Sequence, residues 1–233
     1  MKIALLGYGR MGKEIEKIAL QRGHEIVLRI DSEAPYDITK ADIAIDFSVP
    51  SVAYNNISNC INNAIPVISG TTGWLEKYDD IIALCKEKKG AFIYASNFSL
   101  GVNIFFELNS QLAAMMNALN DYDISMEEIH HTKKLDAPSG TAITLAEGII
   151  NNSDKENWEL DGNVSKETIP ITAKRIPEVP GTHSIEYSSK VDTIEIKHTA
   201  HNRQGFALGA VVAAEWLQDK NGVFTMKDVL NIR

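Results

Sequence analysis

The first 31 residues constrain the fold more than any other stretch of the sequence. An apolar run over residues 2–6 leads into Gly-x-Gly-x-x-Gly, then into an amphipathic helix and a second strand-like run that ends at Asp31. The acid follows the last glycine by about twenty residues, the spacing at which it meets a dinucleotide's ribose, while the glycines let the backbone approach the pyrophosphate. A lone glycine turn can be purely structural, but this context predicts a dinucleotide-binding unit. The candidate cofactor-binding residues are Gly7, Tyr8, Gly9, Arg10, Met11, Gly12 and Asp31.

The alternation of strands and helices continues to residue 95. Strands are predicted over 43–47, 66–69 and 91–95, and helices over 51–63 and 75–88. Strands that alternate with helices of this length indicate a parallel sheet with helices on both faces. The carboxyl ends of such strands line a ligand crevice, so the loops after them are further cofactor candidates. Short polar loops also arise from turn geometry alone. The candidates here are Gly70, Thr71, Thr72, Ala95, Ser96, Asn97 and Phe98.

From residue 100 the pattern changes. A long helix is predicted over 102–119, followed by strands over 124–130, 168–175, 182–188 and 193–199. Successive strands with hairpin-like turns indicate a mixed or antiparallel sheet and hence a second domain. The polar stretch 151–166 is predicted to be a surface excursion, and helices over 208–217 and 226–231 to return to the first domain. The predicted class is therefore α/β: an N-terminal Rossmann-type parallel sheet (residues 1–99 plus 205–233) and a second α+β domain built on a mixed sheet (100–204).

Composition excludes several classes of partner. The net charge of −8 over 233 residues, with no basic stripe, argues against nucleic acid. The apolar runs are shorter than a bilayer span, and Met1-Lys2 leads directly into a strand rather than a signal peptide, so no membrane association is expected. Cys60 and Cys85 form no disulfide framework and are predicted to be free thiols in a reducing cytoplasm.

The stretch from Glu127 to Ala142 concentrates the chemistry of the second domain. His130, His131 and Lys134 lie within five residues of one another. Ser139 follows as a good helix N-cap, so the N–H groups near Ser139, Gly140 and Thr141 are expected to face outward as a seat for an anion. A proton donor, a cation and an anion seat so close together predict a site for a small acidic molecule.

Two other interpretations of this stretch compete with that one. Adjacent histidines and lysines can be a solvated strand end, and Asp-x-Pro-Ser-Gly is ordinary turn chemistry. A metal site is not expected, because His130 and His131 point to opposite faces of a strand and no cysteine or third histidine stands at ligand spacing.

The same stretch carries a resemblance to a known family. Glu128-Ile-His-His-Thr-Lys-Lys-Leu-Asp-Ala-Pro-Ser-Gly-Thr-Ala142 resembles the signature of the 4-hydroxy-tetrahydrodipicolinate (dihydrodipicolinate) reductases of the diaminopimelate route to lysine. Three further blocks, beginning at Gly70, Asn97 and Gly222, resemble other parts of that family, so the resemblance spans the chain from Lys2 to Leu230.

The resemblance implies a nicotinamide-dependent reductase whose second-domain sheet builds a homotetramer. By matching position, His130 is the proton donor or acceptor and Lys134 the proton donor near the reacting ring. The implied residues that bind the dicarboxylate substrate are His131, Ser139, Gly140, Thr141 and Arg203. For Arg203 the alternative, of equal weight, is an arginine on the surface at the end of a strand. Such chemistry is physically consistent, because the cofactor supplies the hydride and the protein supplies a proton and neutralises charge.

Two features depart from the family pattern. The glycine loop is one residue tighter than the Gly-x-x-Gly-Arg-Met-Gly common in the family, which predicts shifted pyrophosphate contacts. Asp31 is followed by Ser32 and Glu33, where a 2′-phosphate would favour a basic residue. We therefore expect a preference for NADH, with NADPH accepted if Arg10 reaches the phosphate.

Two alternatives to this reductase remain at this stage. A non-catalytic dinucleotide sensor would lack clustered acid–base residues in its second domain, but His130, His131 and Lys134 are present. Another two-domain NAD(P)-dependent dehydrogenase of small acids, similar to aspartate dehydrogenase, would not carry the full His-His-x-x-Lys-x-Asp-x-Pro-Ser-Gly-Thr string.

Overall fold

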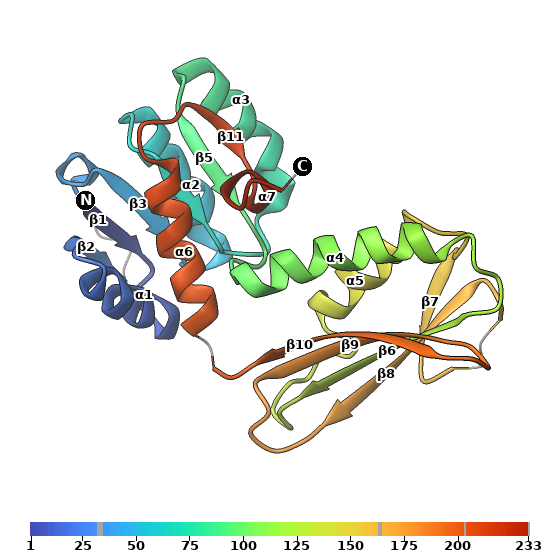
Figure 1. Ribbon diagram of the computed structural model, residues 1–233. Helices are drawn as coiled ribbons and strands as arrows, with labels where there is room; N and C mark the ends of the chain where they lie inside the picture. The colour runs from blue at the N-terminus through green and yellow to red at the C-terminus, as the bar shows by residue number, and fades with distance from the viewer. Residues whose placement is uncertain (32–34, 163–164, 203, 233) are drawn as a thin grey trace. The chain divides into compact units, whose positions relative to one another are not determined.

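The computed structural model describes residues 1–31, 35–162, 165–202 and 204–232. The chain divides into two compact units (Figure 1). The first consists of Met1–Leu100 and Gln204–Arg233, and the second of Gly101–Arg203.

The first unit is built on a six-stranded parallel sheet in the order β11-β5-β4-β3-β1-β2. Crossover helices join β1 to β2, β3 to β4 and β4 to β5, as is usual for parallel pairing, whereas the connection from β2 to β3 carries the 3₁₀ turn Ile38–Lys40. Its strands are β1 (Lys2–Leu6), β2 (Glu25–Ile30), β3 (Ile43–Asp46), β4 (Val67–Ser69), β5 (Ala91–Tyr94) and β11 (Gly222–Phe224). The predicted Rossmann-type sheet is confirmed. The edge strand β11 was not predicted, because three residues are too few to show a period.

Helices cover both faces of this sheet, and the strands supply both cores. Ile3 and Leu5 of β1 pack with α1 (Arg10–Gln21) and α6 (Gln204–Leu217). Ala4 and Leu6 point to the opposite face, where α2 (Pro50–Asn62) and α3 (Tyr78–Lys88) lie. The predicted return of the C-terminal helix is confirmed, since Ala207 to Leu217 lie in the first core together with Met226 of α7 (Met226–Val229). The predicted helix 75–88 is divided: a 3₁₀ turn, Leu75–Lys77, precedes α3.

The second unit carries a five-stranded mixed sheet in the order β10-β9-β6-β8-β7. Strand β6 pairs in parallel with β8 and antiparallel with β9, so the predicted mixed sheet is confirmed. The elements are α4 (Leu100–Met116), β6 (Asp123–His130), α5 (Gly140–Ile150), β7 (Asn157–Leu160), β8 (Thr168–Arg175), β9 (Gly181–Ser188) and β10 (Thr193–Ala200).

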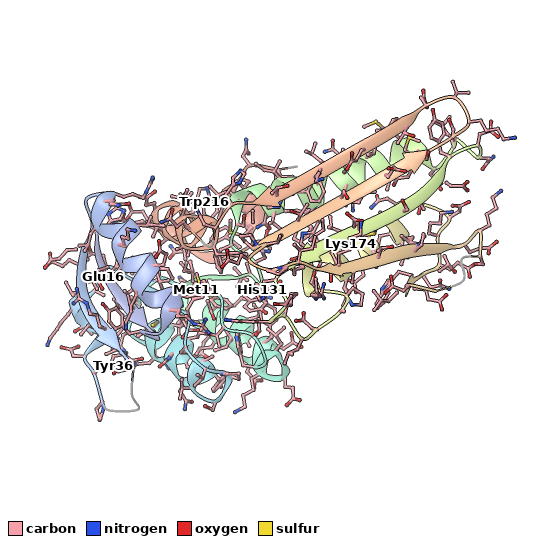
Figure 2. The ribbon with its side chains drawn as sticks, turned by 90° about the horizontal axis from the view of Figure 1, so that it is seen from below. Met11, Glu16, Tyr36, His131, Lys174 and Trp216 are labelled. Atoms are coloured by element: carbon pink, nitrogen blue, oxygen red, sulfur yellow. The ribbon has the colours of Figure 1, made fainter. Side chains whose placement is uncertain are left out.

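One face of this sheet packs under α4 and α5, with Phe105, Leu145, Ile149, Ile171 and Ile185 in the core. The other face is open, and Lys174 of β8 stands on it beside Glu127, with which it forms an ion pair (Figure 2). The prediction that 151–166 is only a surface excursion was wrong, because β7 lies within it. This strand pairs at the sheet edge and alternates exposed with half-buried residues, a pattern too short and polar to stand out. Among the helices of the described residues, none combines the length and apolar character needed to cross a lipid bilayer.

Candidate active site

Strand β6 places the central acid–base residues of the second unit. Its buried positions alternate, so Ile124, Met126, Glu128 and His130 all face the helices. At the inner end of this row, Glu128 is fully buried and His130 is 8% exposed. The strand ends at His130, and His131 lies just beyond it. The alternation of the strand therefore buries the predicted site residue His130 on the same face as Glu128, a carboxylate that was not among the predicted site residues.

Glu128 is held as an anion by two donors. Its Oε2 accepts the Ser139 backbone N–H at 2.9 Å, and its Oε1 accepts Arg175 Nη2 at 3.0 Å. Burial pushes the pKa of Glu128 upward, but the hydrogen bonds from Ser139 and Arg175 outweigh it, and the net pKa is lowered. Arg175 also donates to the carbonyl of Asp136 at 2.7 Å, which ties the loop before α5 to β8.

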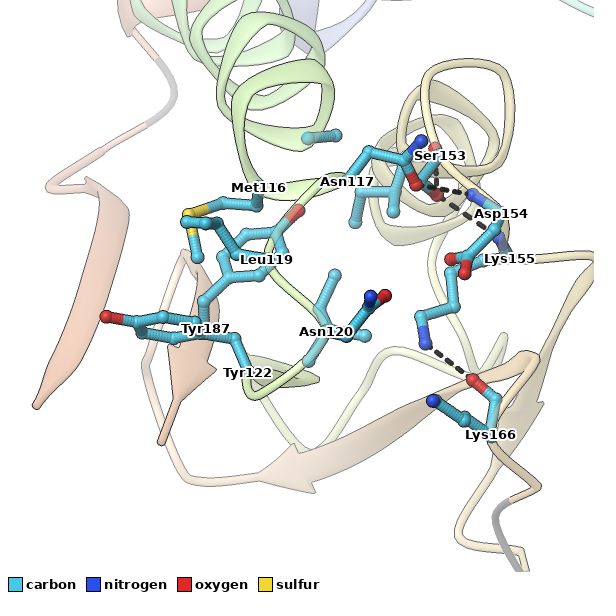
Figure 3. Close-up of a pocket in the computed structure, with 13 residues that line it drawn as sticks. Met116, Asn117, Leu119, Asn120, Tyr122, Ser153, Asp154, Lys155, Lys166 and Tyr187 are labelled. Carbon is cyan, nitrogen blue, oxygen red and sulfur yellow. Dashed lines mark hydrogen bonds between the residues drawn. The ribbon is translucent and has the colours of Figure 1, made fainter. Parts of the chain in front are cut away.

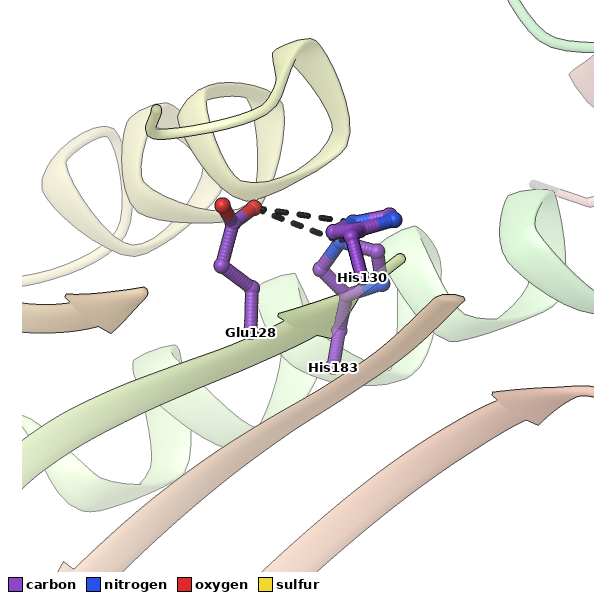
Figure 4. Close-up of side chains that lie close together, drawn as sticks. All are labelled: Glu128, His130 and His183. Atoms are coloured by element: carbon purple, nitrogen blue, oxygen red, sulfur yellow. Dashed lines mark hydrogen bonds and ion pairs between the residues drawn. The ribbon is translucent and has the colours of Figure 1, made fainter. Parts of the chain in front are cut away.

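Two imidazole rings face this carboxylate (Figure 4). His130 Nε2 lies 3.3 Å from His183 Nε2, and the two nitrogens lie 3.7 and 3.8 Å from Glu128 Oε2. Burial lowers the pKa of His130, and it lowers that of His183 to about 4, so His183 is neutral near pH 7. His183 was missed from the sequence because its partners lie far away along the chain. Its position on the buried face of strand 182–188 was the available signal.

Glu128, His130 and His183 also have the composition of a metal site, with ligand atoms within 4.8 Å of one another. His131 does not belong to this group. The charge around the three residues of the cluster is unfavourable for a divalent ion. Arg175 already donates a hydrogen bond to Glu128, and the positive charge of Lys134 acts on both histidines. The chemistry that fits these residues best is therefore the holding of a proton.

The donors at the N-terminus of α5 differ in one respect from those of the predicted anion seat. Ser139 caps the helix by accepting the Ala142 N–H, but its own N–H is donated to Glu128 and its side chain is 2% exposed. Within the described part of the chain, the N–H groups of Gly140 and Thr141 have no acceptor. The space beside the Gly140 Cα is open to at least 4 Å. Two free N–H groups, rather than three, are available to a carboxylate.

The remaining predicted residues of this site differ in their surroundings. Lys134 Nζ is bound to both carboxylate oxygens of Asp136, at 2.7 and 2.9 Å, and its side chain is partly exposed. His131 has a buried Nδ1 atom that finds no partner among the described residues. Arg203 lies outside the described residues, as do Ser32 and Glu33.

A hollow in this unit lies far from the histidines (Figure 3). It is lined by the end of α4, the segment after α5 and the start of β6, including Asn117, Tyr122, Ile124 and Asp154. Asp154 N–H donates to Asn117 Oδ1 at 2.8 Å there. Since a strand rises about 3.3 Å per residue, Ile124 and His130 are roughly 20 Å apart along β6, and this hollow is no part of the site.

In the first unit, the predicted glycine loop has the geometry of a phosphate cradle. Gly7 has a φ of +96°, and its N–H donates to the carbonyl of Ile30, which brings the loop beside Asp31. Helix α1 begins after Gly9 without an acidic residue in its first turn, and within the described residues the N–H groups of its first three residues find no acceptor. A Cβ on Gly9 would meet nothing within 4 Å. The loop therefore leaves open the space and the donors that a pyrophosphate requires. Met11 lies on α1 and packs partly against the core (Figure 2).

The side chain of Tyr8 is already hydrogen-bonded within the first unit. Its hydroxyl donates to Glu16, which also pairs with Arg29 of β2. Arg10 and Asp31 are both exposed.

The loop after β4 is fixed by Asp46 at the end of β3. This fully buried carboxylate accepts the hydroxyls of Ser48, Ser69 and Thr71 at 2.6–2.8 Å and, at 3.3 Å, the amide of Asn56. Burial raises the pKa of Asp46, against the effect of these donors. The Thr71 hydroxyl also accepts the Ser48 N–H, so the side chain of Thr71 serves the loop's own structure. Gly70 is half-buried and Thr72 is exposed.

In the loop after β5, the side chains of Asn97 and Phe98 are engaged in the structure of the protein itself. Phe98 is 1% exposed, and its ring lies 5.7 Å from that of Phe47. Asn97 Oδ1 accepts the Ser99 N–H, Ala95 N–H donates to the carbonyl of Ser69, and Ser96 is exposed. The structure thus assembles the predicted cofactor residues within the first unit and the predicted substrate residues, Arg203 aside, within the second.

Family models account for nearly the whole chain. The N-terminal model of dihydrodipicolinate reductase matches residues 1–98, and the C-terminal model matches residues 101–230. The chain belongs to the dihydrodipicolinate reductase family.

Curated relatives within the dihydrodipicolinate reductase family match over the full length. A 4-hydroxy-tetrahydrodipicolinate reductase of Christiangramia forsetii is 59% identical over 99% of this chain and 98% of its own. One from Thermosipho africanus is 35% identical over the same shares.

Solved structures show the same fold. A dipicolinate-bound dihydrodipicolinate reductase from Paenisporosarcina superposes with a TM-score of 0.80 at 22% identity and covers 100% of this chain and 99% of its own. An aspartate dehydrogenase from Thermotoga maritima reaches 0.51 at 13% identity, over 94% and 97% of the two chains. The fold is thus shared, more distantly, with an aspartate dehydrogenase.

Proposed function

We propose that this protein is a 4-hydroxy-tetrahydrodipicolinate reductase of the diaminopimelate route to lysine. The observation that carries the proposal is the full-length match, at 59% identity, to a relative of that name. In the proposed reaction NAD(P)H gives a hydride and the medium gives a proton, and the products are tetrahydrodipicolinate, water and NAD(P)⁺.

The first unit would hold the dinucleotide. The free N–H groups at the start of α1 and the open space beside Gly9 support pyrophosphate binding there. Asp31 would accept the ribose hydroxyls, and the loops at residues 70–72 and 95–98 would contact the rest of the cofactor. The bound cofactor supplies the hydride, while the protein orients it and excludes water.

The second unit would hold the ring and its two carboxylates. One carboxylate fits the Gly140 and Thr141 N–H groups, with His131 and Arg203 as the further substrate-binding residues, while Ser139 would act by capping the helix that carries these donors. His130 would accept or donate a proton, and Lys134 would neutralise the electron density that hydride addition leaves on the ring. For Lys134 this requires its ammonium group to turn from Asp136 to the substrate.

We propose NADH as the preferred cofactor. Arg29, the basic residue on β2 before Asp31, is already paired with Glu16, and Asp31 itself would repel a 2′-phosphate. Arg10 is exposed at the start of α1 and leaves NADPH as a weaker substrate.

We further propose a homotetramer in the cytoplasm, assembled through the second-unit sheet. The face of that sheet away from α4 and α5 is open, and both cysteines are free and buried, as a reducing compartment permits. Light scattering coupled to size-exclusion chromatography should give the mass of four chains.

A coupled assay tests the proposed activity. Pyruvate and aspartate semialdehyde are condensed by a synthase, and this protein is then added with NADH or NADPH. Cofactor oxidation that needs both the synthase and this protein supports the proposal. Oxidation with oxaloacetate and ammonia instead would indicate an aspartate dehydrogenase, and tight NADH binding without turnover would indicate a sensor.

A further inference from the structure

The segment that leads from β6 into α5 is attached to the sheet through one ion pair. Glu128 of β6 is fully buried, and Arg175 Nη2 of β8 donates to its Oε1 at 3.0 Å. Glu128 Oε2 accepts the Ser139 N–H at 2.9 Å. The same Nη2 atom of Arg175 donates to the Asp136 carbonyl at 2.7 Å. In the part of the chain that the structure describes, these are the two hydrogen bonds that join the backbone of residues 136–139 to the strands. The ion pair therefore fixes both ends of this segment.

Residues 136–139 in turn set the position of the free donors at the start of α5. Ser139 is the N-cap, and Gly140 and Thr141 are the first two residues of the helix. The N–H groups of these two find no acceptor among the described residues, and Gly140 is exposed. Because the chain runs directly from the N-cap into the first turn, any shift of the Ser139 backbone displaces both donors.

The pattern of hydrogen bonds favours a role in placement over a role in stability. A buried ion pair adds little net stability, because the cost of removing two charges from water offsets most of their attraction. Here each member of the pair also binds the backbone of residues 136–139. Glu128 accepts a hydrogen bond at one end of this segment, and Arg175 donates one at the other. The pair thereby fixes the direction in which the chain enters α5.

We propose that Glu128 and Arg175 are positioning residues that aim the two free N–H groups of α5 at a carboxylate of the substrate. The inference rests on the proposed function, in which this carboxylate belongs to the ring diacid. Glu128 is fully buried and acts without touching the substrate. Arg175 has a second effect, because its charge neutralises the Glu128 carboxylate, which would otherwise repel an anion at these N–H groups.

The test uses the full chain and substitutions of this ion pair. Arg175→Met keeps the apolar stem of the side chain and removes both hydrogen bonds of Nη2. Arg175→Lys is the conservative variant, because both bonds start from one nitrogen and a single ammonium group can donate both. If Arg175→Met does not fold because Glu128 is left buried and unpaired, the double variant with Glu128→Gln removes that charge as well. Arg22→Met is the matched control, since it breaks another arginine–glutamate pair, with Glu215, in the first unit.

Two readouts report on the binding of the carboxylate. In the coupled assay, the KM for the ring substrate should rise roughly 10-fold or more in Arg175→Met and in the double variant, with the KM for NADH unchanged. Arg175→Lys should recover most of this loss, and Arg22→Met should match the wild type. Calorimetric titration with pyridine-2,6-dicarboxylate, a stable ring diacid, should rank the Kd values of the variants in the same order. A purely structural role would lower the folded fraction and hence the apparent kcat, but would leave both KM values unchanged.

Wild-type values of the substrate KM and the diacid Kd in Arg175→Met, or in the double variant if the single one does not fold, overturn the proposal. Equal losses in Arg175→Met and Arg175→Lys overturn it too, because the hydrogen bonds would then not be the cause. The diacid titration separates this inference from the proposed function. An inactive wild type whose diacid binding is weakened by Arg175→Met refutes the reductase activity and leaves the positioning role standing, whereas a wild type that neither turns over nor binds the diacid refutes both.

Discussion

The carbonyl oxygen of Phe47 lies 2.1 Å from the position that a Cβ atom on Gly7 would occupy. The ring of the same Phe47 lies 2.4 Å from the corresponding position on Gly70 and packs against Phe98. One residue after β3 therefore holds three loops of the proposed cofactor site against one another. Two of them can approach it only because they carry glycine.

Gly7→Ala should destabilise the fold, whereas Gly9→Ala should not. The first would force its backbone from a φ of +96° and collide with Phe47, at a cost of about 2 kcal/mol or more. The second meets nothing within 4 Å, so its free energy of unfolding should stay within about 0.5 kcal/mol of wild type. Urea unfolding measures both. Gly9→Ala should still weaken NADH binding, and undiminished binding would mean that the pyrophosphate does not approach Gly9.

Asp46→Asn should loosen the loop after β4. An amide in place of the carboxylate removes an acceptor oxygen from a buried group that receives three hydroxyls, at a cost of about 2 kcal/mol. Calorimetric binding should show weaker NADH affinity in parallel. The exposed Asp80→Asn serves as the control and should change neither quantity. Equal effects of the two substitutions would contradict a structural role for Asp46.

Lys134→Ala should reduce turnover strongly and leave cofactor affinity nearly intact. Removing the cation that neutralises the ring is expected to lower kcat by roughly 100-fold or more. The neighbouring Lys133→Ala, which removes the charge of an exposed side chain, should retain activity. Steady-state kinetics and NADH titration distinguish the two lysines. Unchanged turnover in Lys134→Ala would remove this residue from the mechanism.

The stability of the protein should fall on mild acidification because of His183. Its pKa is about 4 in the folded protein against 6.5 as the ordinary value, so the unfolded chain takes up a proton first as the pH drops. The free energy of unfolding should therefore decrease between about pH 6.5 and 4, by up to about 3 kcal/mol from this group. Urea unfolding across that range should show a smaller slope for His183→Gln. An equal slope for the wild type and His183→Gln would mean that another group causes the pH dependence.

The ratio of kcat/KM values for NADH and NADPH tests the cofactor preference. NADH should be favoured, because the carboxylate of Asp31 would repel a 2′-phosphate and the positive charge of Arg29 is already paired with Glu16. Arg10→Ala should widen the ratio by reducing the NADPH value alone. A clear advantage for NADPH in the wild type rejects the preference.

The parts of the fold that were predictable depend on local pattern. The β1–α1–β2 unit was evident because the glycines, the amphipathic helix and Asp31 follow one another at fixed spacing. Ser139 was predictable as a cap for the same reason. Strands β7 and β11 were not, because a run of three or four residues leaves no period to detect.

The parts of the site that were missed depend on contacts between distant residues. His183 and Arg175 reach Glu128 from neighbouring strands, and register alone brings them together. The loss of the Ser139 N–H to Glu128 is of the same kind, since that carboxylate lies eleven residues earlier in the chain. Local sequence predicted which residues carry acid–base groups, but not which of those groups bind one another.

The most direct test of the proposed reaction follows the hydride itself. NADH carrying deuterium at the transferred position of its nicotinamide is supplied to the enzyme with freshly condensed 4-hydroxy-tetrahydrodipicolinate, and the product is analysed by mass spectrometry. We predict tetrahydrodipicolinate that carries one deuterium per NADH oxidised. Oxidation of NADH with no deuterium in the ring product would contradict the assignment.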